Sequence, residues 1–453
     1  MKSKFVAPLS LAAAVAGLFF FQVDIASSVD PRARDPGVRF GPADAGDPIA
    51  GLSANELRFF LHGKEDFEEA EGVADGIGPR MNLDGCGGCH SQPAIGGTSP
   101  AVNPQVAFAN KDGGTDSVPS FIKANGPVRE ARFVRNPDGT PDGGVHALFT
   151  ITGREGADGC NIAQPDFARE LRNNNVIFRI PTPVFGAGLI EQIPDTAILA
   201  NEASNSSAKK ALGIRGKANR VAVSGSANNN GNDGTIARFG WKAQNQTGLL
   251  FAGEAYNVEM GITNELFQVE RDETPTCQFA TVPNDTQNFD AADALAGTTA
   301  IQNFANFQRF LAPPTPSSDT PGGAASIARG KAKFSDVGCA LCHTPALTTG
   351  NSTVPALRVQ TANLYSDILV HDMGDGLADG VSQGQAGPRE FRSAPLWGLG
   401  KRIFFLHDGR TSDLVEAIQQ HSSNGSEANG VIRNFNNLRE NQKQDLLNFL
   451  RSL

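Results

Sequence analysis

The pentapeptide Cys86-Gly-Gly-Cys-His90 recurs later in the chain as Cys339-Ala-Leu-Cys-His343. Two thiols three positions apart can add to the two vinyl groups on one edge of a haem, and the histidine that follows can bind the iron. Because a covalent tether and a nitrogen ligand then hold the cofactor, no large enclosing core is needed. The repeated motif therefore predicts two covalently bound c-type haems, with His90 and His343 as proximal iron ligands.

The six cysteines have different expected roles. Cys89 and Cys342 complete the two motifs. If the four motif thiols bound one zinc ion instead, both motif histidines would be left without a role, so haem attachment is the preferred interpretation. Cys160 and Cys277 remain, and in an oxidising compartment they would form a disulfide, with two buried free thiols as the alternative.

The N-terminus has the pattern of an export signal. Lys2 and Lys4 precede an apolar run over residues 5–23, and small residues follow at 26–28. We expect residues 1–28 to be a signal peptide, with an uncleaved membrane anchor as the alternative. Export indicates the periplasm, which suits c-type haem because this cofactor is attached outside the bacterial cytoplasm.

Composition limits the class of protein and its partners. The chain has 453 residues, of which 40% are hydrophobic and 19% charged, as is typical of globular domains. A net charge of -9 argues against nucleic acid and against an anionic membrane surface as partners. We expect contact with a membrane only if the N-terminal segment stays uncleaved.

Two sequence elements occur twice and in the same order. The stretch Gly63-Lys-Glu-Asp-Phe67 precedes the first motif, and residues 330–334 (Gly-Lys-Ala-Lys-Phe) precede the second. Further on, residues 183–188 (Pro-Val-Phe-Gly-Ala-Gly) match residues 395–400 (Pro-Leu-Trp-Gly-Leu-Gly). A helix that carries a glycine and an aromatic residue before Cys-x-x-Cys-His is how c-type cytochrome domains begin.

The repeat predicts a mainly α fold with two cytochrome c-like domains, of which the first is expanded by long loops and short β-strands. A helix should begin at Ser53, because Glu56 three positions later completes a capping box. Periodicity predicts further helices and strands, and a Pro/Gly-rich linker separates the two domains. The expected parts are an extended lead-in over 29–52, a first domain over 53–310, a linker over 311–325 and a second domain over 326–453, with helices over 324–334, 412–420 and 440–453 and strands over 147–151 and 176–180.

Several longer stretches resemble one known family. They are residues 238–243 (RFGWKA), 259–264 (EMGITN), 365–374 (YSDILVHDMG), 392–400 (RSAPLWGLG), 405–410 (FLHDGR) and 414–418 (LVEAI). Together they resemble the di-haem oxidoreductase family of peroxidase-like proteins and "thiol oxidoreductases", which is related to the bacterial di-haem cytochrome c peroxidases. The resemblance extends over most of the chain, from roughly residue 50 to its end.

The resemblance implies an enzyme of the cytochrome c peroxidase type. Such a di-haem oxidoreductase would reduce hydrogen peroxide, or a related oxidant, at an open first haem. Electrons would reach it through the second haem from a small donor protein, either a cytochrome or a cupredoxin. Two alternatives remain: a non-catalytic di-haem electron-transfer protein, and a haem enzyme that oxidises or oxygenates a substrate.

The resemblance also indicates a distal ligand for the second haem. His421 lies fourteen positions after His407, where related peroxidases usually place a methionine ligand of the electron-transfer haem. Two histidine ligands would give this haem a lower reduction potential. A surface histidine is the alternative for His421, and we expect His407 to have a structural role beside the haem. His371 and Met373 could approach either haem or belong to a structural loop.

For the first haem an open or water-bound iron is expected, since peroxide must reach it. The other conceivable ligands are His62, His146, Met81 and Met260. A general acid/base is needed beside the peroxide, and Glu191 is the candidate because it follows the first Pro-x-x-Gly-x-Gly element. Its rivals are Glu254 and Glu259. Trp241 or Trp397 could carry electrons between the haems, and residues 372–379 could bind the calcium ion found in relatives.

Overall fold

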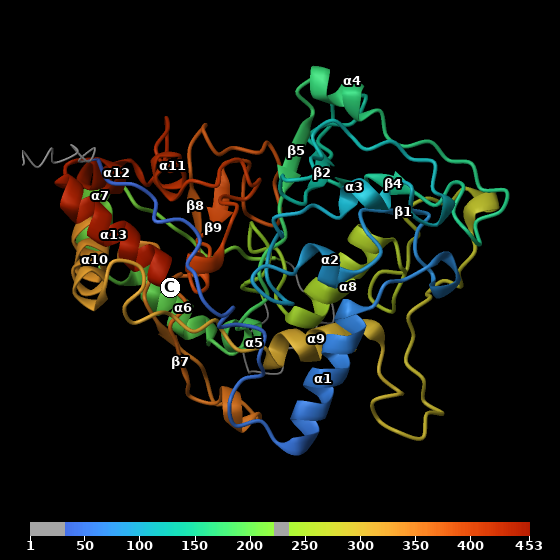
Figure 1. Ribbon diagram of the computed structural model, residues 1–453, viewed down its shortest axis with the longest axis horizontal. Helices are drawn as coiled ribbons and strands as arrows, with labels where there is room; N and C mark the ends of the chain where they lie inside the picture. The colour runs from blue at the N-terminus through green and yellow to red at the C-terminus, as the bar shows by residue number, and fades with distance from the viewer. Residues whose placement is uncertain (1–31, 222–234) are drawn as a thin grey trace, which may run out of the picture. The chain divides into compact units, whose positions relative to one another are not determined.

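Helices hold most of the regular structure in this computed structural model, which describes residues 32–221 and 235–453 (Figure 1). The expected signal sequence over 1–28 lies outside the described residues. Within the part that is described, no helix is long and apolar enough to cross a membrane. Residues 33–453 form one compact unit. Its longer helices are α1 (Ala54–Glu68), α6 (Asp195–Ala203), α8 (Gly248–Met260), α9 (Ala300–Phe310), α10 (Ala324–Val337), α12 (Asn429–Asn436) and α13 (Glu440–Ser452).

The first motif follows a closely packed helix pair. Helix α1 begins at the predicted capping box, in which the Glu56 N–H donates to Ser53 Oγ at 3.3 Å and the Ser53 N–H donates to Glu56 Oε2 at 2.7 Å. Its buried face packs against α9. A Cβ atom at Gly63 would lie 2.2 Å from the Asn303 carbonyl oxygen, so only glycine allows the two helices to approach this closely.

A second helix pair repeats this packing before the second motif. Helix α10 packs against α13, and the two pairs lie in different parts of the molecule (Figure 1). A Cβ atom at Gly330 would lie 1.9 Å from the Asp445 carbonyl oxygen. Gly63 and Gly330, which match in sequence, therefore make the same close helix contact in the two halves.

The second repeated element is also structurally equivalent in the two halves. A Cβ atom at Gly188 would lie 2.0 Å from the carbonyl oxygen of Arg309 in α9, and one at Gly400 would lie 2.1 Å from that of Arg451 in α13. Each element thus packs against the second helix of its own pair. The structure confirms that the repeat extends to packing, while the division into two cytochrome c-like domains remains a prediction.

Short antiparallel strands support the loops of the first half. Strand β2 (Glu130–Phe133) pairs with β3 (Val145–His146) and β5 (Val176–Arg179), and β1 (Arg80–Met81) pairs with β4 (Phe149–Thr150). The predicted strand over 147–151 is thus shorter, because only two of its residues find a partner. The disulfide between Cys160 and Cys277 is present, as expected. Two-stranded pairs complete the strands: β6 (Leu347–Thr348) with β7 (Thr361–Ala362), and β8 (Val370–Asp372) with β9 (Glu390–Arg392).

The expected helices over 324–334, 412–420 and 440–453 are present as α10, α11 and α13. Helices α7 and α12 were not expected from the sequence. The short helices are α2 (Cys86–Cys89), α3 (Gln105–Phe108), α4 (Phe167–Arg172), α5 (Ala187–Glu191), α7 (Ser206–Leu212) and α11 (Leu414–Gln419).

Candidate functional site

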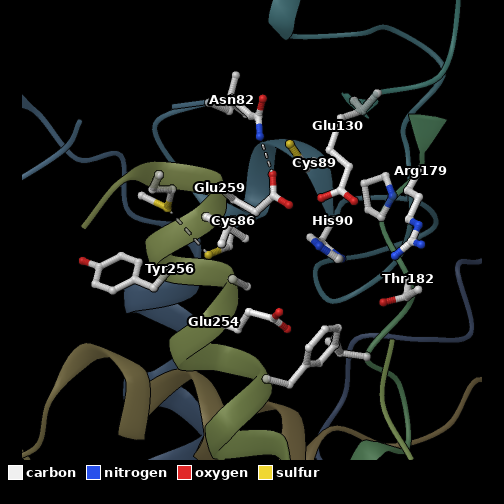
Figure 2. A pocket seen from close by; sticks show the side chains of 18 of the residues that line it. Asn82, Cys86, Cys89, His90, Glu130, Arg179, Thr182, Glu254, Tyr256 and Glu259 are labelled. Atoms are coloured by element: carbon white, nitrogen blue, oxygen red, sulfur yellow. Dashed lines mark hydrogen bonds between the residues drawn. The ribbon is translucent and has the colours of Figure 1, made fainter. Parts of the chain in front are cut away.

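The first motif opens on a cavity whose walls come from distant parts of the chain (Figure 2). Helix α2 carries Cys86 and Cys89, α8 supplies one wall, and strands β2 and β5 supply another. Among the residues that the structure describes, His90 is the only histidine and Met260 the only methionine lining this cavity. The sulfur of Met260 lies 4.0 Å from that of Cys86, one of the two thiols of the motif.

His90 is oriented as a metal ligand would be. Its Nδ1 lies 2.9 Å from the Gly97 carbonyl oxygen, which can only accept, so the proton is on Nδ1 and Nε2 keeps its lone pair. Burial lowers the pKa of His90 to about 4, so the ring is neutral. The edge of Phe67, the aromatic residue of the repeated element, meets the ring with centroids 5.9 Å apart.

The second motif opens on a cavity with a different lining. Four histidines line it: His343, His371, His407 and His421. His343 Nδ1 lies 3.0 Å from the Tyr365 carbonyl oxygen, and His421 Nδ1 lies 2.8 Å from that of Ala417. Both rings therefore keep Nε2 as a possible ligand.

The pKa values of these two histidines are lowered. Burial, followed by the repulsion that two protonated rings would exert if His343 and His421 were both charged, lowers the pKa of His343 to about 4. Burial likewise lowers the pKa of His421, although its hydrogen bonds to backbone oppose the shift. Both imidazoles are thus held in the neutral form that binds iron. The expected pairing of His343 with His421 therefore has both residues in one cavity, with matching tautomers.

The other two histidines of this cavity are held differently. His371 Nε2 lies 3.0 Å from Asp367 Oδ2, and His371 Nδ1 lies 3.0 Å from Glu427 Oε2. With carboxylates at both nitrogens, this ring is anchored on strand β8, and its Nδ1 also lies 3.6 Å from Cys342 Sγ. His407 stacks on Phe391 with ring centroids 4.3 Å apart, which agrees with the expected structural role.

The remaining candidate ligands lie elsewhere. Met81 is fully buried in an apolar core cluster. His146 stacks on Phe133 and lies 2.8 Å from Asp142, whereas His62 lies on α1 near acidic side chains. Met373 lines the second cavity, so it remains a rival of His421 by position alone.

Carboxyl groups line the first cavity. Glu259 accepts a hydrogen bond from Asn82 Nδ2 at 2.8 Å and also shares one with Glu130. Burial, followed by the charge of Glu130, raises the pKa of Glu259 well above its usual range. Burial would raise the pKa of Glu130, but the charges of Arg132 and Arg179 and the hydrogen bonds with Arg132 and Glu259 together outweigh it and lower this pKa to about 2. One carboxyl of the pair is thus ionised and the other is protonated.

Glu254 is the other acidic candidate in this cavity. It lies on α8, one turn before Glu259, and its carboxylate accepts a hydrogen bond from Asn245. Figure 2 shows Glu254 and Glu259 reaching into the same cavity from one helix.

The expected position of Glu191 is wrong. Its carboxylate accepts the Gly248 N–H at 3.0 Å, at the start of α8, and lies 3.5 Å from Arg309 Nε. Residues that line the first cavity do not include it. The reason is that α5 packs Gly188 against α9, which directs Glu191 to the N-terminus of α8 rather than to the motif. Repetition in the sequence identified the right half of the molecule but could not show which side of α5 faces the cavity.

Comparison with known proteins identifies the family. A family model described as "Di-haem oxidoreductase, putative peroxidase" matches residues 140–453. This chain belongs to the di-haem oxidoreductase family. The matched residues include the second motif and α8, while the first motif lies before them. Two haems are accordingly its cofactors.

Solved structures add little. The hydrazine synthase of Kuenenia stuttgartiensis, pressurised with xenon, has a TM-score of 0.35 at 11% identity over 98% of this chain and 100% of its own. The di-haem peroxidase BthA of Burkholderia thailandensis has a TM-score of 0.29 at 14% identity over 48% of this chain and 66% of its own. At these scores neither likeness bears on the function. No curated protein matches the sequence.

Buried charge indicates that the family's haems fit these cavities. Arg392 and Arg402 line the second cavity at 9% and 8% exposure, and burial lowers the pKa of each to about 10. Arg392 Nε donates to the Gly240 carbonyl oxygen at 3.0 Å. Neither guanidinium has a carboxylate partner among the described residues. Haem propionates would supply the missing negative charge. Arg129 in the first cavity similarly donates to the Asp408 carbonyl oxygen, at 3.1 Å.

One aromatic residue joins the two cavities. Trp241 lines both of them, and its Nε1 donates to the Ile180 carbonyl oxygen at 2.9 Å. Trp397 instead packs against Gly186 in a separate apolar cluster.

The expected calcium site over residues 372–379 has no support, because the described residues hold no group of three or more potential metal ligands. Within that loop, Asp372 pairs with Arg389, and Asp379 pairs with buried basic side chains.

Proposed function

We propose that this oxidoreductase is a periplasmic c-type di-haem peroxidase that reduces hydrogen peroxide at its first haem and receives electrons through its second. The observation that carries the proposal is the difference between the two cavities. His343 and His421 provide two neutral imidazoles in the second. The first has His90 alone, together with carboxyl groups, among the described residues that line it.

Covalent attachment follows from the motifs. The sulfurs of Cys86, Cys89, Cys339 and Cys342 would each form a thioether with a haem vinyl group. All four lie at cavity walls, beside a histidine with Nε2 available. When bound, a haem iron with one open coordination position supplies the redox chemistry of peroxide reduction.

The acid/base role passes from Glu191 to Glu259. Reduction of peroxide to two waters consumes two electrons and two protons, so a proton donor must lie beside the bound peroxide. Glu259 holds a proton because burial, followed by the charge of ionised Glu130 and the hydrogen bond that the two carboxyl groups share, raises its pKa. Asn82 fixes the orientation of the Glu259 carboxyl group. Glu254 reaches into the same cavity and is the rival.

Trp241 is the proposed connection between the haems. Its indole forms part of the wall of both cavities, and its hydrogen bond to Ile180 fixes the ring. A small cytochrome or cupredoxin in the periplasm would deliver electrons on the side of the second haem. The arrangement of neutral histidines there suits electron transfer, because two strong ligands leave no position for peroxide.

Two measurements test the proposal. Reduced protein should bind one carbon monoxide per two haems, because one iron is open and the other has two protein ligands. With a reduced cytochrome donor, the protein should then turn over hydrogen peroxide. Binding of no carbon monoxide would indicate an electron-transfer protein. Carbon monoxide binding without peroxide turnover would indicate an enzyme that oxidises another substrate.

A further inference from the structure

The chain contains very few aromatic residues that can be oxidised. It has 29 phenylalanines but only two tyrosines and two tryptophans. Phenylalanine does not lose an electron at the potentials that haem enzymes reach, whereas tyrosine and tryptophan do. Within the described residues, the first cavity is lined by one of each, Tyr256 and Trp241. Trp241 also lines the second cavity, which suits its proposed role between the haems. Tyr256 lines only the first cavity, so that role does not account for it.

Tyr256 is paired with a carboxylate. It lies on α8 with 4% of its surface exposed, and its hydroxyl donates to Glu71 Oε1 at 2.9 Å. Figure 2 shows this hydroxyl pointing away from His90. Glu71 lies just after α1 and is half-buried, so it connects the tyrosine to the surface.

The pair lies near the edge where the first haem would be attached. Met260, one turn after Tyr256 on α8, brings its sulfur to 4.0 Å from that of Cys86. Cys86 and Tyr256 both line the first cavity. The thioether edge of the macrocycle would therefore lie beside Tyr256.

The electrostatics favour a joint transfer of an electron and a proton. Burial, followed by the charge of Glu71, raises the pKa of Tyr256 beyond its usual range, so the phenol does not ionise by itself. Burial also raises the pKa of Glu71 to about 7, which makes it a proton acceptor near neutral pH. The neighbouring carboxyl groups that act on the pair are Asp66, Glu69, Asp75 and Asp285.

We propose that Tyr256 and Glu71 form a proton-coupled redox site that removes an oxidising equivalent from the first haem when the second haem supplies no electron. Tyr256 loses one electron to the peroxide-oxidised haem, and its O–H bond breaks. The proton forms a new O–H bond on Glu71, which leaves a neutral tyrosyl radical and a neutral carboxylic acid. The electron from Tyr256 would replace one of the two that the first haem, held by Cys86, Cys89 and His90, would have given to peroxide.

The return step completes the balance. A one-electron reductant, either the donor protein or a small thiol, reduces the radical, and Glu71 returns its proton to the phenolate oxygen. The half-buried position of Glu71 allows the proton to exchange with solvent if the radical lives long enough. This inference rests on the proposed reaction of the first haem with peroxide, and the experiment separates the two.

The first experiment uses electron paramagnetic resonance on holoprotein mixed with hydrogen peroxide in the absence of a donor. A tyrosyl radical should form, and its signal should narrow when the protein carries ring-deuterated tyrosine. Tyr256→Phe should abolish the signal. Tyr365→Phe is the matched control, because Tyr365 is the only other tyrosine, and it should retain the signal. A signal that persists in Tyr256→Phe would overturn the inference. So would the absence of a tyrosyl radical in wild-type protein whose first haem does react with peroxide.

Glu71→Gln tests the proton transfer. Glutamine can still accept the hydrogen bond but cannot take the proton, so radical formation should slow by roughly a hundredfold, within the range of general bases. In the wild type, formation should be faster above pH 7, where Glu71 is ionised. The variant should lose this pH dependence. Unchanged rates and pH dependence in Glu71→Gln would exclude Glu71 as the acceptor.

A second oxidant keeps the test independent of peroxide chemistry. If the first haem does not react with peroxide, the proposed function fails, and flash-quench oxidation with a ruthenium trisbipyridine sensitiser still tests the pair. The Tyr256 radical should then form in the wild type and be lost in Tyr256→Phe. Absence of this radical under flash-quench oxidation would overturn the inference on its own.

Discussion

The two motif-bearing halves share their packing and differ in their cavities. In each, a glycine on the helix before the motif meets a backbone carbonyl of a partner helix, in α1 with α9 and in α10 with α13. In each half, the Nδ1–H of the motif histidine donates a hydrogen bond to a backbone carbonyl oxygen. The cavities differ in their other described lining residues: three carboxyl groups line the first, whereas three further histidines and one carboxyl group, that of Glu427, line the second.

The comparison shows which parts of such a site are constrained by attachment and which by chemistry. Attachment needs the cysteines, the neutral histidine and a rigid helix pair, and these are the features that repeat. The proposed second iron ligand and the proposed proton donor come from segments outside the repeat. His421 follows α11, whereas Glu259 lies on α8 and Glu130 on β2. Two copies of one scaffold can therefore hold haems with different reactivity.

Replacing His421 should remove the difference between the two haems. In His421→Ala the second haem should lose its low-spin signal, because one of two imidazole ligands is absent. Carbon monoxide binding should rise from one to two molecules per reduced protein, and the potential of this haem should rise. Absorption spectra of His421→Ala and His421→Met are the direct measurement of this change in ligation. An unchanged low-spin signal in His421→Ala would identify Met373 or His371 as the ligand.

Replacing Glu259 should affect only the first haem. Glu259→Gln keeps the shape of the side chain and removes the exchangeable acid proton, so peroxide turnover should fall by roughly a hundred- to ten-thousandfold with both haems retained. Wild-type turnover should be lost as the pH rises through the raised pKa of Glu259, since the acid form is required. Steady-state rates against pH measure both effects. Glu254→Gln is the matched comparison, and a larger loss there would transfer the role to Glu254.

The sequence predicted the features that depend on neighbouring residues or on repetition. The capping box at Ser53, the two attachment motifs and the matched glycines Gly63 and Gly330 are of this kind. The disulfide was expected from the compartment and the cysteine count. By contrast, the Glu130–Glu259 pair joins residues far apart in sequence, and no local pattern marks it. Hydrogen bonds and buried charges of this kind depend on how loops fold over the cavity.

The error over Glu191 has the same origin. The repeated element before Glu191 identified the correct half of the molecule, but which face of a five-residue helix meets the cavity depends on tertiary packing. Two acidic residues on α8 were recognised only as rivals. Their spacing of five positions places both on neighbouring turns, yet the same spacing is common on solvated helices. Only the cavity itself distinguishes the two cases.

The matched glycines should be about equally sensitive to substitution. Gly63→Ala and Gly330→Ala each place a Cβ atom at about 2 Å from a carbonyl oxygen, so the helices must separate. Overpacking of this kind lowers the free energy of unfolding by about 1–3 kcal/mol. Thermal unfolding of the holoprotein measures it. Gly248→Ala is the control, because its Cβ atom would have no neighbour closer than 4.0 Å. A large effect in only one of the two variants would contradict equivalent packing.

Replacing Glu191 should produce the smallest effect and should concern stability alone. Its carboxylate lies at the N-terminus of α8, where the helix dipole and the Gly248 N–H favour a negative charge, and Arg309 adds a partly buried ion pair. Glu191→Gln keeps the acceptor and removes the charge, so the free energy of unfolding should fall by about 0.3–1 kcal/mol. Peroxide turnover should stay at the wild-type value, because the side chain does not line the first cavity. Arg309→Gln alone and with Glu191→Gln completes a double-mutant cycle, in which a non-additive loss of stability would confirm the ion pair. A loss of turnover comparable to that of Glu259→Gln, with both haems retained, would instead return the acid/base role to Glu191.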